Sequence, residues 1–146
     1  MIKFFYKVIY QKKNQESTFD LGVFSNLRKA KIKIEQISTQ KGFKDWLDGF
    51  RIVKFGVRFP KDYKHSKENI KLYNISHEYE IEESGVVYDI YKIFDIVSSF
   101  AIAKERVEFL KQHTQRGKKY PDGFEINTII VDNYNSWSEG FDDYEN

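Results

Sequence analysis

Hydrophobic and polar residues alternate most regularly between positions 73 and 82 of the chain. One face of this segment collects aromatic and apolar residues with one histidine: Tyr73, Ile75, His77, Tyr79 and Ile81. The other face collects polar and acidic residues: Asn74, Ser76, Glu78, Glu80 and Glu82. A period of two predicts a β-strand with one packed face and one solvated face, which is typical of an antiparallel sheet with helices on a single side.

The same order of elements is predicted twice along the chain. In the first half the patterns predict two strands, a helix capped by Ser25 or Asn26, and a third strand, at 4–10, 18–24, about 27–40 and 50–57. In the second half they predict the same succession, at 72–81, 86–96, 99–113 and 124–131.

Sequence similarity between the two halves supports this order. The segment Trp46–Phe50 recurs as Tyr120–Phe124, and both contain Asp-Gly-Phe. Five positions of the first helix recur 73 residues later, where Leu27, Ala30, Lys31, Ile34 and Ile37 become Phe100, Ala103, Lys104, Val107 and Leu110. We therefore predict an α+β fold of two tandem ββαβ repeats that form a pseudo-dimer, with antiparallel sheet or sheets and helices on one face.

A polar segment that contains proline separates the two halves. It shows no strand or helix period, so we interpret residues 58–70 as a connector. The predicted organisation is a first repeat at 1–57 and a second repeat at 71–146 that includes a C-terminal tail.

The composition favours a folded protein and excludes several classes of chemistry. Of the 146 residues, 40% are hydrophobic and 17% are aromatic, which is too much apolar material for a disordered chain. The absence of cysteine excludes disulfides, thiolate metal sites and cysteine nucleophiles. No apolar stretch approaches 18 residues and no leader pattern is present, so we expect a soluble, cytoplasmic protein without a membrane partner.

The sequence lacks the motifs of common enzymes. It contains no glycine-rich phosphate loop and no Gly-x-Ser-x-Gly motif, and its three histidines lack the spacing of paired metal ligands on a helix. We therefore expect no enzymatic activity, no cofactor and no metal.

Charge is distributed unevenly along the chain. Residues 1–66 carry 15 Lys and Arg against 6 Asp and Glu, whereas residues 67–146 carry 9 against 16. This distribution favours either mutual neutralisation of the two halves or electrostatic attraction to a partner of opposite charge.

The acidic half supplies the candidate residues for partner binding. The glutamates at 78, 80 and 82 form a row on one strand face, and the tail combines rings with carboxylates. The candidates are Glu78, Glu80, Glu82, Glu83, Trp137, Glu139, Asp142, Asp143 and Tyr144. A solvated sheet face and a tail docked on the protein's own core are the alternative interpretations.

The basic half supports a less favoured alternative, a nucleic-acid-associated regulatory protein. Its phosphate-binding candidates are Lys29, Lys31, Lys33, Lys41, Lys44, Arg51 and Lys54. Edge strands of an open sheet could also pair between copies of the chain and give a homo-oligomer.

Two segments of the second half resemble a known family. The Tyr120–Phe124 turn (Tyr-Pro-Asp-Gly-Phe) and the Trp137–Phe141 segment (Trp-Ser-Glu-Gly-Phe) are similar to signatures of small, uncharacterised bacterial domains over about residues 72–141. The usual threonine of the second signature is Ser138 here, and the first half resembles a degenerate copy. The resemblance implies an immunity role against a bacterial toxin. The acidic half independently indicates a protein-binding module whose partner has a basic surface.

Overall fold

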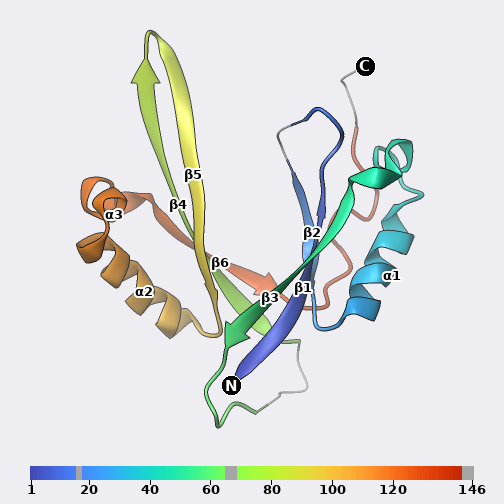
Figure 1. Cartoon of the computed structure of the whole chain (residues 1–146), viewed down its shortest axis with the longest axis horizontal. Helices are drawn as coiled ribbons and strands as arrows, with labels where there is room; N and C mark the ends of the chain where they lie inside the picture. Colours follow the sequence, from blue (N-terminus) through green and yellow to red (C-terminus); the bar gives the residue numbers. More distant parts are fainter. Residues whose placement is uncertain (16–17, 65–68, 143–146) are drawn as a thin grey trace. The chain divides into compact units, whose positions relative to one another are not determined.

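A computed structural model describes residues 1–15, 18–64 and 69–142 of the chain (Figure 1). The protein is α+β, with two three-stranded antiparallel sheets, as the sequence predicts. It divides into two compact units. Unit 1 comprises residues 1–70 and 130–146, and unit 2 comprises residues 71–129.

Unit 1 is a three-stranded sheet covered by one α-helix. Its strands lie in the order β2-β1-β3 and are antiparallel. Its elements are β1 (Ile2–Tyr10), β2 (Phe19–Phe24), α1 (Leu27–Ile37), two short 3₁₀ turns (Phe43–Asp45 and Leu47–Gly49) and β3 (Phe50–Arg58). The Asn26 side chain accepts a hydrogen bond from the Lys29 amide and so caps α1. The helix ends three residues before the predicted end near Gln40, in a turn in which the Gln40 amide bonds the Ile37 carbonyl.

The core of unit 1 is unusually aromatic. Tyr10 is fully buried, and its ring lies 4.9 Å from that of Phe43 and 4.8 Å from that of Phe50. A bulge in β2 at Leu21 and Gly22 interrupts the pairing with β1. Gly22 has a φ of 125°, a conformation that a side chain would strain.

Unit 2 repeats the succession strand, strand, helix, strand. Its elements are β4 (Lys71–Glu83), β5 (Val86–Val97), α2 (Phe100–His113), α3 (Gln115–Lys119), the 3₁₀ turn η3 (Pro121–Gly123) and β6 (Phe124–Ile130). The strands lie in the order β5-β4-β6. The inner face of the sheet packs on α2 through Ile75, Ala103, Val107 and Leu110. The predicted alternation holds for Tyr73 and Ile75, which pack with α2, although Ser76 on the opposite face is also buried.

The C-terminal tail packs on unit 1, although the sequence grouped it with the second half of the chain. The Val131 amide donates to the Ile70 carbonyl (2.8 Å), and the Asp132 amide donates to the Val23 carbonyl at the end of β2 (2.9 Å). Residues 131–142, which we call the tail, then run beside β2 and α1 (Figure 1). None of the described helices is long and apolar enough to cross a membrane.

Candidate functional site

Asp132 fastens the start of the tail to the N-terminal end of α1. Its carboxylate accepts hydrogen bonds from the Ser25 amide (2.8 Å) and the Ser25 hydroxyl (2.7 Å). It also pairs with the Lys29 ammonium at 3.1 Å. Burial by itself would raise the pKa of Asp132, but the bonds from Ser25 and Lys29 outweigh it and hold the pKa below its usual value.

Lys33 fixes the middle of the tail. Its side chain is fully buried, and its ammonium donates to the carbonyls of Tyr134 (2.9 Å) and Ser136 (2.5 Å). Burial lowers the pKa of this lysine because the charged form loses its hydration. The amine thus joins two tail carbonyls to a helix more than 100 positions earlier in the chain.

The aromatic residues of the tail pack on rings of unit 1. The Phe141 ring lies 4.5 Å from Phe19 and 4.8 Å from Phe43, and the Trp137 ring lies 4.9 Å from Phe19. Trp137 remains 41% exposed. The structure therefore favours, for these rings, the alternative of a tail docked on its own core.

The acidic candidates of the tail are placed differently from one another. Asp142 forms an ion pair with Lys41, and Glu139 is exposed. Asp143 and Tyr144 lie outside the described residues. Because the tail belongs to unit 1, that unit holds 16 Lys and Arg against 12 Asp and Glu, and unit 2 holds 8 against 10. Much of the charge asymmetry along the sequence is thus neutralised within unit 1.

We expect Asp132→Asn to lower the free energy of unfolding at pH 7 by about 1–3 kcal/mol, because a neutral amide loses the ion pair and weakens the charge-assisted bonds. The folded-state pKa of Asp132 is lowered, so its contribution is complete above the unfolded pKa and is lost as the pH falls through the folded one. Urea unfolding at pH 7 and pH 3 measures both effects. The difference in free energy of unfolding between wild type and variant must be smaller at pH 3 than at pH 7. A difference that does not change contradicts the stabilising role of the Asp132 carboxylate.

The glutamates predicted as a site on β4 lie next to a cluster of hydrogen-bonded side chains at the base of the long β4–β5 hairpin. Fully buried His77 donates from Nε2 to the Tyr120 carbonyl (2.7 Å) and accepts at Nδ1 from Arg116 Nε (2.6 Å). Another nitrogen of the same guanidinium donates to the His77 carbonyl on β4 (2.9 Å) and the Ile90 carbonyl on β5 (2.7 Å). Arg116 therefore links β4 and β5 at the base of the hairpin.

Two tyrosines and a glycine complete this base. The Tyr79 and Tyr120 rings stack at 4.1 Å, and the Arg116 guanidinium lies 4.8 Å from the centre of the Tyr79 ring. A Cβ at Gly123 would lie 2.4 Å from the Glu78 carbonyl oxygen, so only glycine allows η3 to approach β4 this closely.

Above this base, β4 and β5 continue as a two-stranded ribbon (Figure 1). β6 begins beside His77, where the Phe124 ring lies 4.5 Å from the imidazole. We call residues 78–91 the acidic arm. This segment contains five carboxylates and no Lys or Arg.

The acidic arm has two chemically different faces. The register places Glu78, Glu80 and Glu82 opposite Tyr91, Asp89 and Val87, respectively. The other face pairs Tyr79 with Ile90 and Ile81 with Tyr88. Val86, Val87, Tyr88 and Tyr91 are each about half exposed. One side of the ribbon thus carries four carboxylates together with Tyr91 and Val87, and the other side is mainly apolar but includes Glu83.

A groove lies at the base of the acidic face and has a volume of about 440 Å³. Its acidic lining residues are Glu78, Glu80, Asp122 and Glu125. Tyr79 and Tyr91 supply rings to the same groove. Carboxylates beside aromatic rings suit the side chain of a lysine or arginine, which gains from both ion pairing and cation–π contact.

The structure brings four of the predicted site residues together and adds three that the sequence missed. Glu78, Glu80, Glu82 and Glu83 all lie on the arm, whereas Trp137, Glu139 and Asp142 lie in unit 1. Asp122, Glu125 and Tyr91 join the groove through strand pairing and the approach of η3. The Pro-Asp-Gly turn was the signal for Asp122, but the turn pattern by itself does not indicate which strand it approaches.

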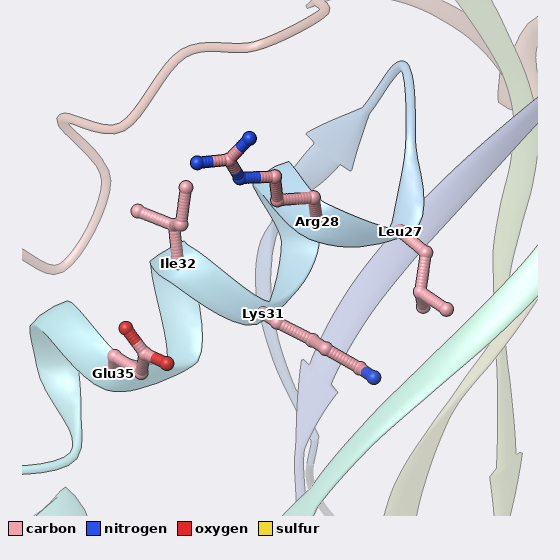
Figure 2. A pocket seen from close by; sticks show the side chains of 5 residues that line it. All are labelled: Leu27, Arg28, Lys31, Ile32 and Glu35. Atoms are coloured by element: carbon pink, nitrogen blue, oxygen red, sulfur yellow. The ribbon is translucent and has the colours of Figure 1, made fainter.

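Several basic residues of the nucleic-acid alternative are engaged inside unit 1. Lys33 is buried, Lys29 pairs with Asp132, and Lys41 pairs with Asp142. Figure 2 shows Arg28 and Lys31 on the outer surface of α1, beside a depression that is lined from this helix alone. Side chains of one helix do not converge on a ligand, so this depression supports no binding site.

No grouping of three or more His, Asp or Glu side chains suited to a metal ion occurs within the part of the chain that the structure describes. Comparisons with models of protein families, with curated proteins and with solved structures find no match to this chain. The resemblance to small bacterial domains therefore stays a prediction.

Proposed function

We propose that the protein is a non-enzymatic protein-binding module whose acidic arm binds a basic surface of a partner protein. The observation that carries the proposal is the concentration of charge in the arm: residues 78–91 hold five carboxylates and no basic residue, while the rest of unit 2 has a surplus of Lys and Arg. Charged residues that served solubility alone would not need acidic and basic groups to be separated in this way.

Like charges across the ribbon support a binding role. Glu80 and Asp89 occupy directly opposite positions on β4 and β5, an arrangement that destabilises a sheet. A two-stranded ribbon also gains little stability of its own. Because the arm has both of these destabilising features, binding of a partner explains it better than stability of the fold does.

The groove and the two faces indicate the chemistry of that partner. A lysine or arginine of the partner would enter the groove beside Glu78 and Asp122. The exposed Tyr91, which lines the same groove, would pack against the apolar stem of that basic residue. Nucleic acid is disfavoured at the arm, because its phosphates would be repelled.

The biological setting of the proposal is an immunity-type antagonist in the bacterial cytoplasm, where the partner is a toxin with a basic surface. We also infer that the two units arose by duplication of a ββαβ element and form a pseudo-dimer. The matching order of elements and the recurrent Asp-Gly-Phe turns support this inference.

The decisive experiment is a pull-down from the native host with three forms of the chain. The test variant is Glu78→Lys/Glu80→Lys/Glu82→Lys, and the matched control is Glu35→Lys/Glu105→Lys/Glu108→Lys, which reverses three helical glutamates. We expect wild type and control to retain the same basic protein. Its binding should weaken with rising salt. The test variant should lose at least 100-fold in affinity for this partner.

Two results would contradict the proposal. One is a partner whose affinity and salt dependence survive the reversal on the arm. The other is steeply salt-dependent binding of single-stranded or duplex oligonucleotides by the wild type, which would support the basic half as the functional surface.

A further inference from the structure

His77 has a fixed protonation state in the folded chain, because each of its two hydrogen-bond partners can play only one role. Tyr120 offers a backbone carbonyl oxygen, which only accepts, so the Nε2 nitrogen 2.7 Å away must carry a hydrogen. Arg116 offers a guanidinium N–H, which only donates, so the Nδ1 nitrogen 2.6 Å away must present its lone pair. The folded chain therefore holds His77 as the neutral imidazole with its hydrogen on Nε2.

The packing around this imidazole disfavours a second proton. The ring of His77 is fully buried, and the Phe94 and Phe124 rings lie 6.3 Å and 4.5 Å from it. A Cβ at Gly123 would lie 2.8 Å from Nε2, so η3 also lies against the ring. A proton on Nδ1 would replace the hydrogen bond from Arg116 and place a second positive charge beside the guanidinium, at a position that is closed to water.

No carboxylate among the described residues bonds the imidazole to offset such a charge. Lys92 lies directly opposite His77 on β5 and therefore on the same face of the sheet, and Arg116 approaches from α3. Tyr79 and Tyr120 add rings from β4 and from the residue before η3. The carboxylates of the neighbouring segments line the groove on the acidic face: Glu78, Asp122 and Glu125.

The partner of His77 is the same residue that links the hairpin to α3. The Arg116 guanidinium also donates to the His77 and Ile90 carbonyls, and it lies 4.8 Å from the centre of the Tyr79 ring. A proton on Nδ1 removes the acceptor and brings two cations together, so the guanidinium must move away from the imidazole. Its bonds to β4 and β5 are lost in the same movement, because all of them come from one rigid fork.

We infer that the base of the acidic arm is a pH-sensitive contact, in which uptake of one proton by His77 expels Arg116 and releases β4 and β5 from α3. The proton comes from solvent and forms the Nδ1–H bond. The released form binds one proton more than the closed form, so a lower pH favours release and a higher pH favours closure. An exposed histidine takes up its proton near about pH 6.5. The equilibrium constant for release should therefore rise about tenfold from pH 7.5 to pH 5.5.

Nuclear magnetic resonance of the full-length chain tests this inference without a partner. The ¹⁵N shifts of the imidazole report its tautomer. Solvent exchange of the Arg116 Nε–H, corrected for the intrinsic pH dependence of exchange, reports the equilibrium constant for release. We expect the Nε2–H tautomer at pH 7.5 and a release constant that is about tenfold larger at pH 5.5.

Two single variants identify the group that takes up the proton. His77→Gln is the test variant, because its amide keeps one acceptor and one donor but takes up no proton. His113→Gln is the matched control, since it removes a histidine from an exposed position at the end of α2. Between pH 7.5 and pH 5.5 we expect the release constant to change by less than about twofold in His77→Gln and by about tenfold in His113→Gln.

Three results would overturn the inference. The first is an imidazole that is charged, or carries its hydrogen on Nδ1, at pH 7.5. The second is a wild-type release constant that does not change with pH. The third is an equal rise in His77→Gln, because another group would then take up the proton.

If His77→Gln does not fold, the pH dependence of the wild type decides. Its release constant must level off above about pH 7.5 and approach a tenfold rise per pH unit below about pH 6, as uptake of a single proton by a histidine requires. A curve of another shape overturns the inference. None of these measurements involves a partner, so their failure leaves the proposed function of the arm standing.

Discussion

Replacing Lys33 with Met is expected to lower the free energy of unfolding by about 3 kcal/mol and to release the tail from unit 1. Methionine keeps the apolar stem of the side chain but provides no donor. The carbonyls of Tyr134 and Ser136 then lose the ammonium that joins them to α1, at a position that is closed to water. Release of the tail also removes Phe141 from the aromatic core around Tyr10.

Three measurements check this result. Urea unfolding gives the change in stability, limited proteolysis reports cleavage within 131–142, and tryptophan emission reports the loss of the contact between Trp137 and Phe19. The matched control is Lys31→Met, at an exposed position of the same helix, which should change stability by less than about 0.5 kcal/mol. A Lys33→Met protein that keeps wild-type stability and a protected tail contradicts the role assigned to Lys33.

The sequence predicted the regular elements well because their signals are local. Alternation over 73–82 identified the packed face at the start of β4, and the Ser25–Asn26 pair indicated the cap of α1. The α+β class followed from the order of the elements.

The position of the tail could not be predicted because it depends on contacts across more than 100 residues. In the sequence, Lys33 belongs to a run of alternating lysines that suggests a solvated helix surface. Burial of a lysine is rare, and nothing near position 33 indicates the two carbonyls that stabilise it. The charge asymmetry was interpreted along the chain, whereas the fold brings acidic tail residues onto the basic half.

Only part of the candidate site on the arm was predicted, because the rest of it also depends on contacts between segments that are distant in sequence. A strand period places Glu78, Glu80 and Glu82 on one face without knowledge of the fold. The groove also needs Asp122 and Glu125, which come from η3 and β6. Their proximity depends on β6 lying beside β4, and strand order is a property of topology that a local pattern does not encode.

Replacing Arg116 with Met is expected to lower the free energy of unfolding of unit 2 by about 3 kcal/mol. Three acceptors lose their donor together: His77 Nδ1 and the carbonyls of His77 and Ile90. Arg116→Lys should recover only a small part of this loss, because an ammonium cannot reproduce the fork of the guanidinium. Near-ultraviolet circular dichroism should weaken as the stack of Tyr79 on Tyr120 loosens.

Lys118→Met is the matched control, since it removes one positive charge from the same short helix at an exposed position. It should leave both stability and partner binding almost unchanged. Electrostatics alone predicts that loss of the Arg116 charge strengthens binding of a basic partner, because the surroundings of the arm become more negative. If Arg116 positions the arm, its loss should instead weaken binding, because an arm that is free to move at its base must be ordered on binding. We expect Arg116→Met to weaken partner binding more than tenfold while Lys118→Met does not, and stronger binding by Arg116→Met would show that this residue does not position the arm.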